Sequence, residues 1–148
     1  METVLAPSRT TRENLGFLLA KASQRWNELL YEQFTLRGFP EVRPSYGSIL
    51  IPLFEEDGLR MGEIARRARL SKQTMTTMVR LLERDGLVVR ERDASDGRAY
   101  RVLLTERAKT FQPVAEEVLA NLHARIEERL TKPQERALKR ALKGVISI

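Results

Sequence analysis

Two short amphipathic segments, separated by a break of about three residues and followed by two strand-like runs, restrict the possible folds more than any other feature. Apolar residues at i, i+3, i+4 and i+7 predict a helix over 61–68. Ser71 can cap a second helix that runs to residue 85, where Gly86 ends it. The apolar stripe of this second helix is Met75, Met78, Val79 and Leu82. Two helices joined by so short a turn predict a helix-turn-helix, in which the first helix braces the second.

Segments 87–91 and 99–104 predict the two strands of a hairpin, which makes the motif winged. The turn between the apolar runs, ERDASDGRAY at residues 91–100, carries more charge than a turn needs. We expect Asp93 or Asp96 to accept hydrogen bonds from the backbone or from Arg98 and so to fix this turn. Gly97 is expected to permit a positive φ there.

Long amphipathic patterns flank the winged motif on both sides, and Thr105 and Thr131 are suited to cap helices in the second flank. We expect one domain over 1–148, with a winged helix-turn-helix at 44–105 and dimerisation helices at 12–38 and 106–148. A small core cannot cover such broad apolar faces, so two chains are expected to bury them in a symmetric dimer. The alternative is a monomer that folds these helices back on itself. The predicted fold class is mainly α with a small β-hairpin wing.

Two prolines interrupt predicted helices. Pro52 lies inside a predicted helix over 45–54 and is expected to kink or shorten it, because it removes a backbone donor. Pro113 suggests a bend in the helix that follows Thr105.

The composition excludes several classes of protein. The chain has no cysteine, which excludes disulfides, thiolate metal sites and thiol redox sensing. No apolar run approaches the roughly 20 residues that span a bilayer, and the start METVLAPSRTTREN lacks a signal-peptide pattern, so we expect a cytoplasmic chain without a membrane partner. No phosphate loop, Ser/His/Asp set or ligand cluster indicates an enzyme or a cofactor. With His123 as its single histidine, the sequence also gives no reason to expect a transition-metal site.

Positive charge is concentrated in one part of the chain. Residues 60–101 hold 11 basic and 6 acidic side chains, which gives +5 of the total net charge of +6. Such runs are often only solvated faces, but this concentration favours a polyanionic partner, double-stranded DNA.

The predicted helix from Ser71 has a polar face without acidic residues. Gln can bond an adenine edge, Thr offers a hydroxyl and a methyl group, and Lys or Arg can take phosphate or guanine. Three threonines are also poor choices for a helix that is merely solvated. The candidate DNA contacts on this helix are Lys72, Gln73, Thr74, Thr76, Thr77 and Arg80.

The hairpin offers a second mode of contact, because an arginine near a tight turn can enter a narrow minor groove. Arg98 is the candidate for this role, with Asp96 and Gly97 shaping its approach. Arg92 and Arg101 are candidates for flanking phosphates. The alternative is a surface hairpin held by Asp–Arg pairs, which contribute only about 0–1 kcal/mol when exposed.

The run from Met61 to Ala108 resembles the winged helix-turn-helix of the MarR (multiple antibiotic resistance regulator) family of bacterial transcription factors. The resemblance lies in Glu63-Ile64-Ala65, the segment LERDGLV at 82–88, the wing DASDGR at 93–98 and Leu104-Thr105-Glu106. It implies a homodimer whose helix from Ser71 enters the major groove, with Arg98 in the minor groove, and which represses by occupying a pseudopalindromic operator. Ala108 stands where the family commonly has glycine, and Pro52 is a second departure.

Many similar proteins release DNA when a small phenolic or aromatic acid binds between the dimer helices and the winged domain. The candidate pocket residues here are Arg25, Trp26, Tyr31 and Tyr46, although aromatic side chains at helical spacing more often belong to a core. A different function also stays open, a winged helix that binds DNA without choosing sequence or that binds another protein.

Overall fold

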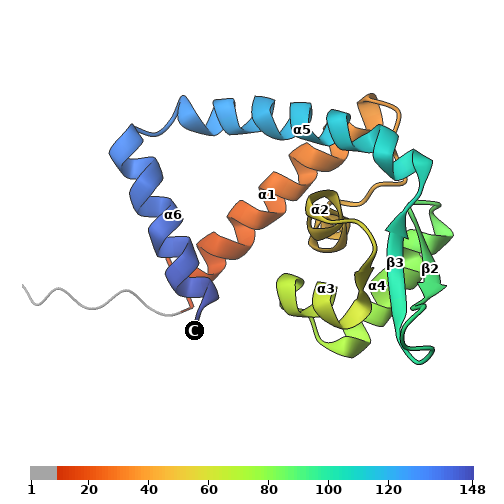
Figure 1. Cartoon of the computed structure of the whole chain (residues 1–148). Helices are drawn as coiled ribbons and strands as arrows, with labels where there is room; N and C mark the ends of the chain where they lie inside the picture. The colour runs from red at the N-terminus through yellow and green to blue at the C-terminus, as the bar shows by residue number, and fades with distance from the viewer. Residues whose placement is uncertain (1–9) are drawn as a thin grey trace, which may run out of the picture.

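The computed structural model describes residues 10–148 and contains six α-helices, one 3-10 helix and three strands in that range. In chain order they are α1 (Leu15–Leu36), η1 (Pro44–Tyr46), α2 (Gly47–Glu55), β1 (Leu59–Arg60), α3 (Met61–Ala68), α4 (Lys72–Arg84), β2 (Val88–Arg92), β3 (Tyr100–Leu104), α5 (Glu106–Glu127) and α6 (Lys132–Ile146). Helices α1, α5 and α6 frame a triangle beside the winged part of the chain (Figure 1). The expected class, mainly α with a small wing, is confirmed.

Side-chain caps begin the helices where the sequence predicted them. The hydroxyl of Ser71 accepts from Thr74 N at 3.1 Å, and that of Thr105 accepts from Ala108 N at 3.2 Å. Thr131 and Gln134 form a reciprocal capping box at the start of α6. Each cap satisfies a backbone donor that a helix end leaves free, so these polar residues fix where α4, α5 and α6 begin.

Two residues with left-handed backbones set the geometry of the helix-turn-helix and of its exit. Arg69, at φ 54°, ends α3 and lets Leu70 N donate to Ala65 O at 3.0 Å. Gly86, at φ 76°, ends α4, and Leu87 N then donates to Leu82 O at 2.9 Å. These tight exits bring α3 against α4 and send the chain straight into β2.

The wing belongs to a three-stranded antiparallel sheet with the order β1-β3-β2. In the hairpin, Val88 pairs with Leu104 and Arg92 with Tyr100. The sequence analysis missed β1, since a strand of two residues is too short to show alternation. Its pairing sets Arg60 opposite Arg101 and so ties the start of α3 to the base of the wing.

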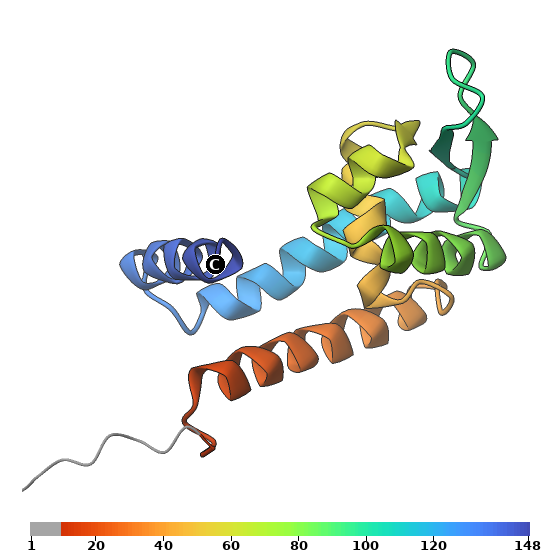
Figure 2. The ribbon, with the colours of Figure 1, turned by 90° about the horizontal axis from the view of Figure 1, so that it is seen from below.

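The core joins the helix-turn-helix to the near halves of α1 and α5. Phe111 of α5 lies at its centre, 4.8 Å from the ring of Phe34 and 5.1 Å from that of Phe39. Toward its start, α1 leaves Leu15 77% exposed, and α6 has no fully buried residue. Figure 2 shows α6 standing apart from α1. Much of the apolar surface of the long helices is therefore uncovered in a single chain.

Both helices continue through their prolines. Helix α2 begins at Gly47 and continues past Pro52 to Glu55, so the expected shortening is wrong. Pro52 is buried, and packing of this short helix into the core offsets the hydrogen bond that proline removes. Helix α5 likewise runs through Pro113 to Glu127.

No helix among residues 10–148 is long and apolar enough to cross a membrane. The expectation about a signal peptide concerns the start of the sequence, which lies mostly outside these described residues.

Tyr46 provides a specific test of this packing. It is 1% exposed, and its hydroxyl donates to Asp85 Oδ2 at 2.5 Å, which links η1 to the end of α4. Tyr46→Phe should lower the free energy of unfolding by about 1–2 kcal/mol, because it removes the buried hydrogen bond to Asp85 and leaves this carboxylate only the exposed Arg84 as a side-chain donor. Urea unfolding at fixed protein concentration measures this. Tyr31→Phe is the control, since Tyr31 is 49% exposed, and an equal loss in both variants would contradict the assigned link.

Candidate nucleic-acid interface

Helix α4 presents two different faces. Met75, Val79 and Leu82 are buried in the core, which confirms most of the predicted stripe. On the opposite side Lys72, Gln73, Thr77 and Arg80 are exposed, and Thr76 is half-buried. Thr74 is also exposed, but its backbone N–H and hydroxyl are engaged by the capping Ser71. The candidate side chains of this helix therefore lie together at its outer surface.

Two of the three threonines of α4 use their hydroxyl protons within the helix. Thr76 donates to Lys72 O at 2.8 Å and Thr77 donates to Gln73 O at 3.0 Å. Such bonds to the preceding turn explain how a helix tolerates these residues. Thr76 and Thr77 therefore offer a ligand their methyl groups and the lone pairs of their hydroxyl oxygens.

One buried carboxylate organises the wing. The side chain of Asp93 is 1% exposed and accepts from Arg60 Nε at 2.9 Å and from Arg101 Nε at 2.7 Å. It also accepts from Ser95 N at 2.8 Å, from Ser95 Oγ at 2.5 Å and from Asp96 N at 3.2 Å. Asp96 has the smaller role of accepting from Arg98 N at 3.1 Å. The sequence left the choice between the two aspartates open, and the geometry gives the main part to Asp93.

These donors also determine the charge of Asp93. The hydrogen bonds from Ser95, followed by that from Arg60, hold the pKa of this carboxyl far below its usual range and outweigh the effect of burial. Asp93 is therefore ionised at all ordinary pH values, and it keeps two arginines at the base of the wing.

Two of the arginines expected to meet phosphates are engaged within the fold. Arg101 bonds Asp93 and also donates to Gly58 O at 2.8 Å. Arg92 donates to Gly97 O at 3.0 Å, and its guanidinium lies 5.6 Å from the ring centre of Tyr100. Both side chains therefore shape the wing, and only their exposed parts can contact a phosphate.

The expectation of a positive φ at Gly97 is wrong. Among residues 10–148 the glycines with positive φ are Gly38, Gly58 and Gly86. The turn closes instead through hydrogen bonds from Ala99 N to Asp96 O at 3.0 Å and from Asp93 N to Ala99 O at 2.9 Å. Because aspartate side chains bond the nearby backbone, the turn needs no left-handed residue.

Three cations near the wing and α4 have no side-chain partner among residues 10–148. Of the 11 basic residues between 60 and 101, eight form an ion pair or side-chain hydrogen bond with another described residue. The side chains of the other three form none within residues 10–148: Lys72, Arg80 and Arg98. All three belong to the set predicted to contact DNA.

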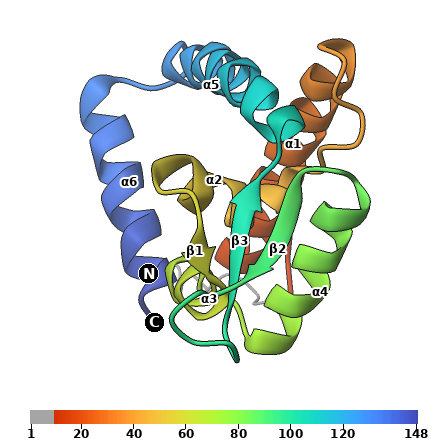
Figure 3. The same cartoon turned by 45° about the vertical axis from the view of Figure 1, so that its right-hand side comes forward.

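Two of these free cations, Lys72 and Arg98, line a groove between the helix-turn-helix and the wing. Lys72 and Thr76 of α4 line it on one side and Arg98 and Tyr100 on the other, around a volume of about 540 Å³. The start of α4 and the tip of the hairpin lie at the same end of the molecule (Figure 3). Glu63 also lines this groove. Hydrogen bonds from Arg66 and then Arg67 lower its pKa to about 2, so it is ionised at neutral pH, and the two arginines offset its negative charge. The surface can therefore receive a polyanion.

The four candidate pocket residues do not converge on one site. Trp26 lines an apolar cavity of about 280 Å³ between α1, α2 and α5. Tyr46 is buried against Asp85, Arg25 pairs with Glu28 on an exposed face, and Tyr31 lines a separate open depression along α1. The cation at the cavity is Arg43, which the sequence analysis missed because a residue before a 3-10 turn belongs to no periodic pattern.

Comparisons with known proteins agree with this geometry. The sequence model of the MarR family matches residues 44–100, from η1 to the start of β3. The chain is 40% identical over 90 residues to the HTH-type transcriptional repressor Rv2887 of Mycobacterium tuberculosis. That match covers 61% of this chain and spans 65% of the length of the repressor.

Solved structures extend the likeness to nearly the whole chain. PcaV from Streptomyces coelicolor, solved in complex with its natural ligand, has a TM-score of 0.79 at 21% identity and covers 97% of this chain and 98% of its own. The transcriptional repressor CouR, solved bound to a 23-mer DNA duplex, has a TM-score of 0.68 at 27% identity and covers 98% of this chain and 97% of its own. The similarity to PcaV, at 21% identity, shows the fold alone. CouR has the same fold at a higher identity of 27%.

The wing should respond to acid through Asp93. The pKa of Asp93 is lower in the folded chain than in the unfolded chain, where an aspartate has a pKa of about 3.9. The unfolded chain therefore binds the proton more readily, so this contribution is present above about pH 4 and is lost as the pH falls further. In Asp93→Asn, amide hydrogen exchange of residues 95–99 should accelerate at neutral pH. The free energy of unfolding of this variant should also change less with pH in the acid range than that of the parent chain. Asp96→Asn is the matched control, and equal exchange in both variants would contradict the role of Asp93.

Proposed function

Since this chain is a member of the MarR family through its winged helix-turn-helix, we propose that it is a homodimeric, cytoplasmic transcriptional regulator that represses by occupying a pseudopalindromic DNA operator. The observation that carries the proposal is the group of three free cations, Lys72, Arg80 and Arg98, on α4 and the wing. Regulators of this family are not enzymes. The solved complex of CouR with a DNA duplex supports the choice of partner.

The two parts of the interface have different roles in this proposal. Lys72, Gln73 and the threonines at the start of α4 meet base edges in the major groove, while Arg80 meets a phosphate further along. Arg98 extends from the wing into the adjacent minor groove, where a narrow A·T-rich groove attracts arginine. Asp96 bonds the backbone of Arg98, and Arg92 and Arg101 hold the wing with their exposed parts turned toward the flanking backbone.

A dimer of this chain is supported by the apolar surface that one chain leaves open. Within the described chain α6 has no fully buried residue, yet Leu138, Leu142 and Val145 lie along it. Leu15 and Leu18 of α1 are similarly exposed. Apolar surface on this scale marks an interface, and a symmetric pair would present two copies of α4 to successive major grooves, about 34 Å apart.

The alternative is a winged helix that coats DNA without choosing sequence, or that binds a protein. Competition with bulk DNA separates these functions. A regulator should prefer its site by a factor of roughly 10³ or more, whereas a coating protein should show almost no preference.

The cavity beside Trp26 supports a ligand that controls DNA binding. Its walls include Phe34, Phe54 and Phe111, and the side chain of Arg43 forms no hydrogen bond or ion pair within residues 10–148. An aromatic ring would pack among these side chains while its carboxylate pairs with Arg43. The ligand class we propose is therefore a small aromatic or phenolic acid that releases the DNA.

Replacement of Arg98 tests the DNA interface. Arg98→Ala should weaken binding to a selected operator about tenfold, reduce the preference for flanking A·T pairs, and lower the salt dependence by about one ion. Gel-shift titrations at several salt concentrations measure all three. Arg125→Ala removes the same charge from the exposed surface of α5 and should change little. Equal affinities of the two variants would remove the minor-groove role of Arg98.

The ligand proposal is tested by the fluorescence of Trp26, the single tryptophan of the chain. Titration with salicylate as a probe should change this emission saturably and weaken operator binding. Arg43→Gln should reduce the apparent affinity about tenfold, which corresponds to loss of a hydrogen bond to a charged group. Arg25→Gln is the matched control on the exposed face of α1. Unchanged emission, or equal losses in both variants, would contradict a site at this cavity.

A further inference from the structure

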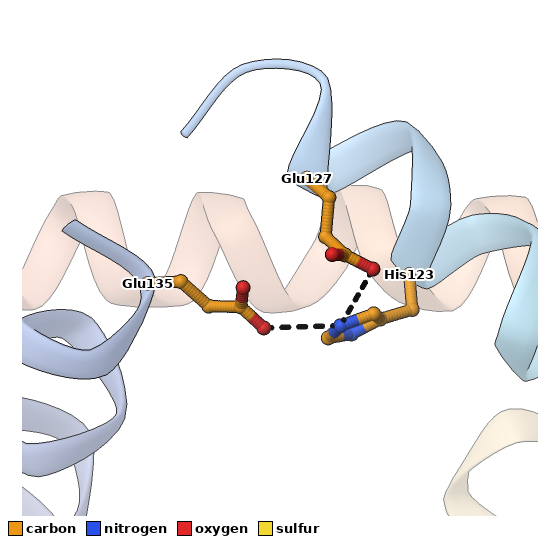
Figure 4. A group of neighbouring side chains, drawn as sticks. All are labelled: His123, Glu127 and Glu135. Carbon is orange, nitrogen blue, oxygen red and sulfur yellow. Dashed lines mark ion pairs between the residues drawn. The ribbon is translucent and has the colours of Figure 1, made fainter. Parts of the chain in front are cut away.

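Two carboxylates, one from α5 and one from α6, meet one ring nitrogen of His123 at the junction of these helices (Figure 4). His123 Nε2 lies 3.1 Å from Glu127 Oε1, one helical turn along α5, and 3.0 Å from Glu135 Oε1 in the first turn of α6. The donor atoms of all three lie within 4.8 Å of one another. A single N–H on Nε2 can point well at only one of the two carboxylates.

The three donors match the ligand set of a divalent transition metal. Zinc takes an imidazole nitrogen and carboxylate oxygens at about 2.0–2.2 Å, so two ligand atoms of a tetrahedral shell lie about 3.3–3.5 Å apart. The observed separations of 3.0 and 3.1 Å from Nε2 need only small changes to reach that spacing. One cation at the centre would satisfy all three groups, which a single proton cannot.

The positions of these residues are fixed by the helices that carry them. His123 and Glu127 are separated by four residues and share a face of α5. Glu135 follows directly after the capping box of Thr131 and Gln134, and its side chain is only 14% exposed. The sequence analysis did not expect a metal site because it looked for a second histidine or a cysteine, and a glutamate on the next helix carries no such signal.

Two lysines share the carboxylates. Lys132 Nζ lies 2.6 Å from Glu127 Oε2 and 3.8 Å from Glu135 Oε2, the oxygens that do not face His123. Lys139 Nζ lies 3.4 Å from Glu135 Oε1 and would move aside on its flexible stem.

We propose that His123, Glu127 and Glu135 form a binding site for a divalent transition-metal ion such as Zn²⁺. The protein supplies three ligands and leaves a fourth position for water. The ion would join α6 to α5 across the turn at residues 128–131, which would fix a helix that has no fully buried residue in the described chain. Imidazole in the set favours zinc and its neighbours over magnesium.

Calorimetric titration of the full-length chain, without an added histidine tag, with Zn²⁺ tests the site. We expect saturable binding of one ion per chain, with no comparable binding of Mg²⁺. His123→Ala and Glu135→Gln should each weaken Zn²⁺ binding at least tenfold, roughly the smallest loss seen even when outer partners of metal ligands are removed. Glu128→Gln is the control beside the site. The background is small because the chain has one histidine and no cysteine.

The absence of saturable Zn²⁺ binding would overturn the proposal. So would an affinity in His123→Ala and Glu135→Gln that equals the affinity of Glu128→Gln. Equal affinity for Mg²⁺ would overturn the assignment to a transition metal. Circular dichroism identifies any variant that fails to fold, and Glu127→Gln, which keeps the shape of its side chain, then takes its place with the same expected loss.

Discussion

The buried carboxylate of Asp93 is the interaction on which the shape of the interface depends. It gathers Arg60 from the start of the helix-turn-helix, Arg101 from β3 and the backbone of the wing turn at one point. The wing is thereby joined to the framework that carries α4. Arg60 and Arg101 are paired with Asp93 and so help to build the wing. The positive charge left for a ligand is therefore confined to a few side chains whose relative positions the fold sets.

A second constraint comes from the mismatch between a small core and long helices. The cluster around Phe111 is sufficient to hold the near ends of α1 and α5, but it cannot cover their far ends or α6. Most of the large exposed apolar residues lie on α1 and α6, whereas the free cations lie on α4 and the wing. These elements occupy different parts of the fold (Figures 1 and 3). One part is therefore available for association with a second copy and the other is available for DNA, and the proposed function requires both.

Local patterns in the sequence predicted much of this structure. Helix caps at Ser71, Thr105 and Thr131, and the apolar stripe of α4, depend on residues a few positions apart and were confirmed. Features that depend on distant residues were missed: the pairing of β1 with β3, and the presence of Arg43 at the cavity. The choice of Asp93 over Asp96 also depended on Arg60, 33 positions away along the chain. The sequence indicated the whole set of proposed DNA contacts. The structure was needed to separate Arg98, which is free, from the arginines that are already paired within the wing.

The central claim is that α4 and the wing of a dimer read a specific DNA site together. Hydroxyl-radical footprinting on a genomic fragment selected for binding tests it most directly. The account predicts two protected half-sites with centres about 10 bp apart, each flanked by protection of the adjacent minor groove. Protection that extends evenly along the fragment, with no preferred sequence and no two-fold pattern, would contradict it.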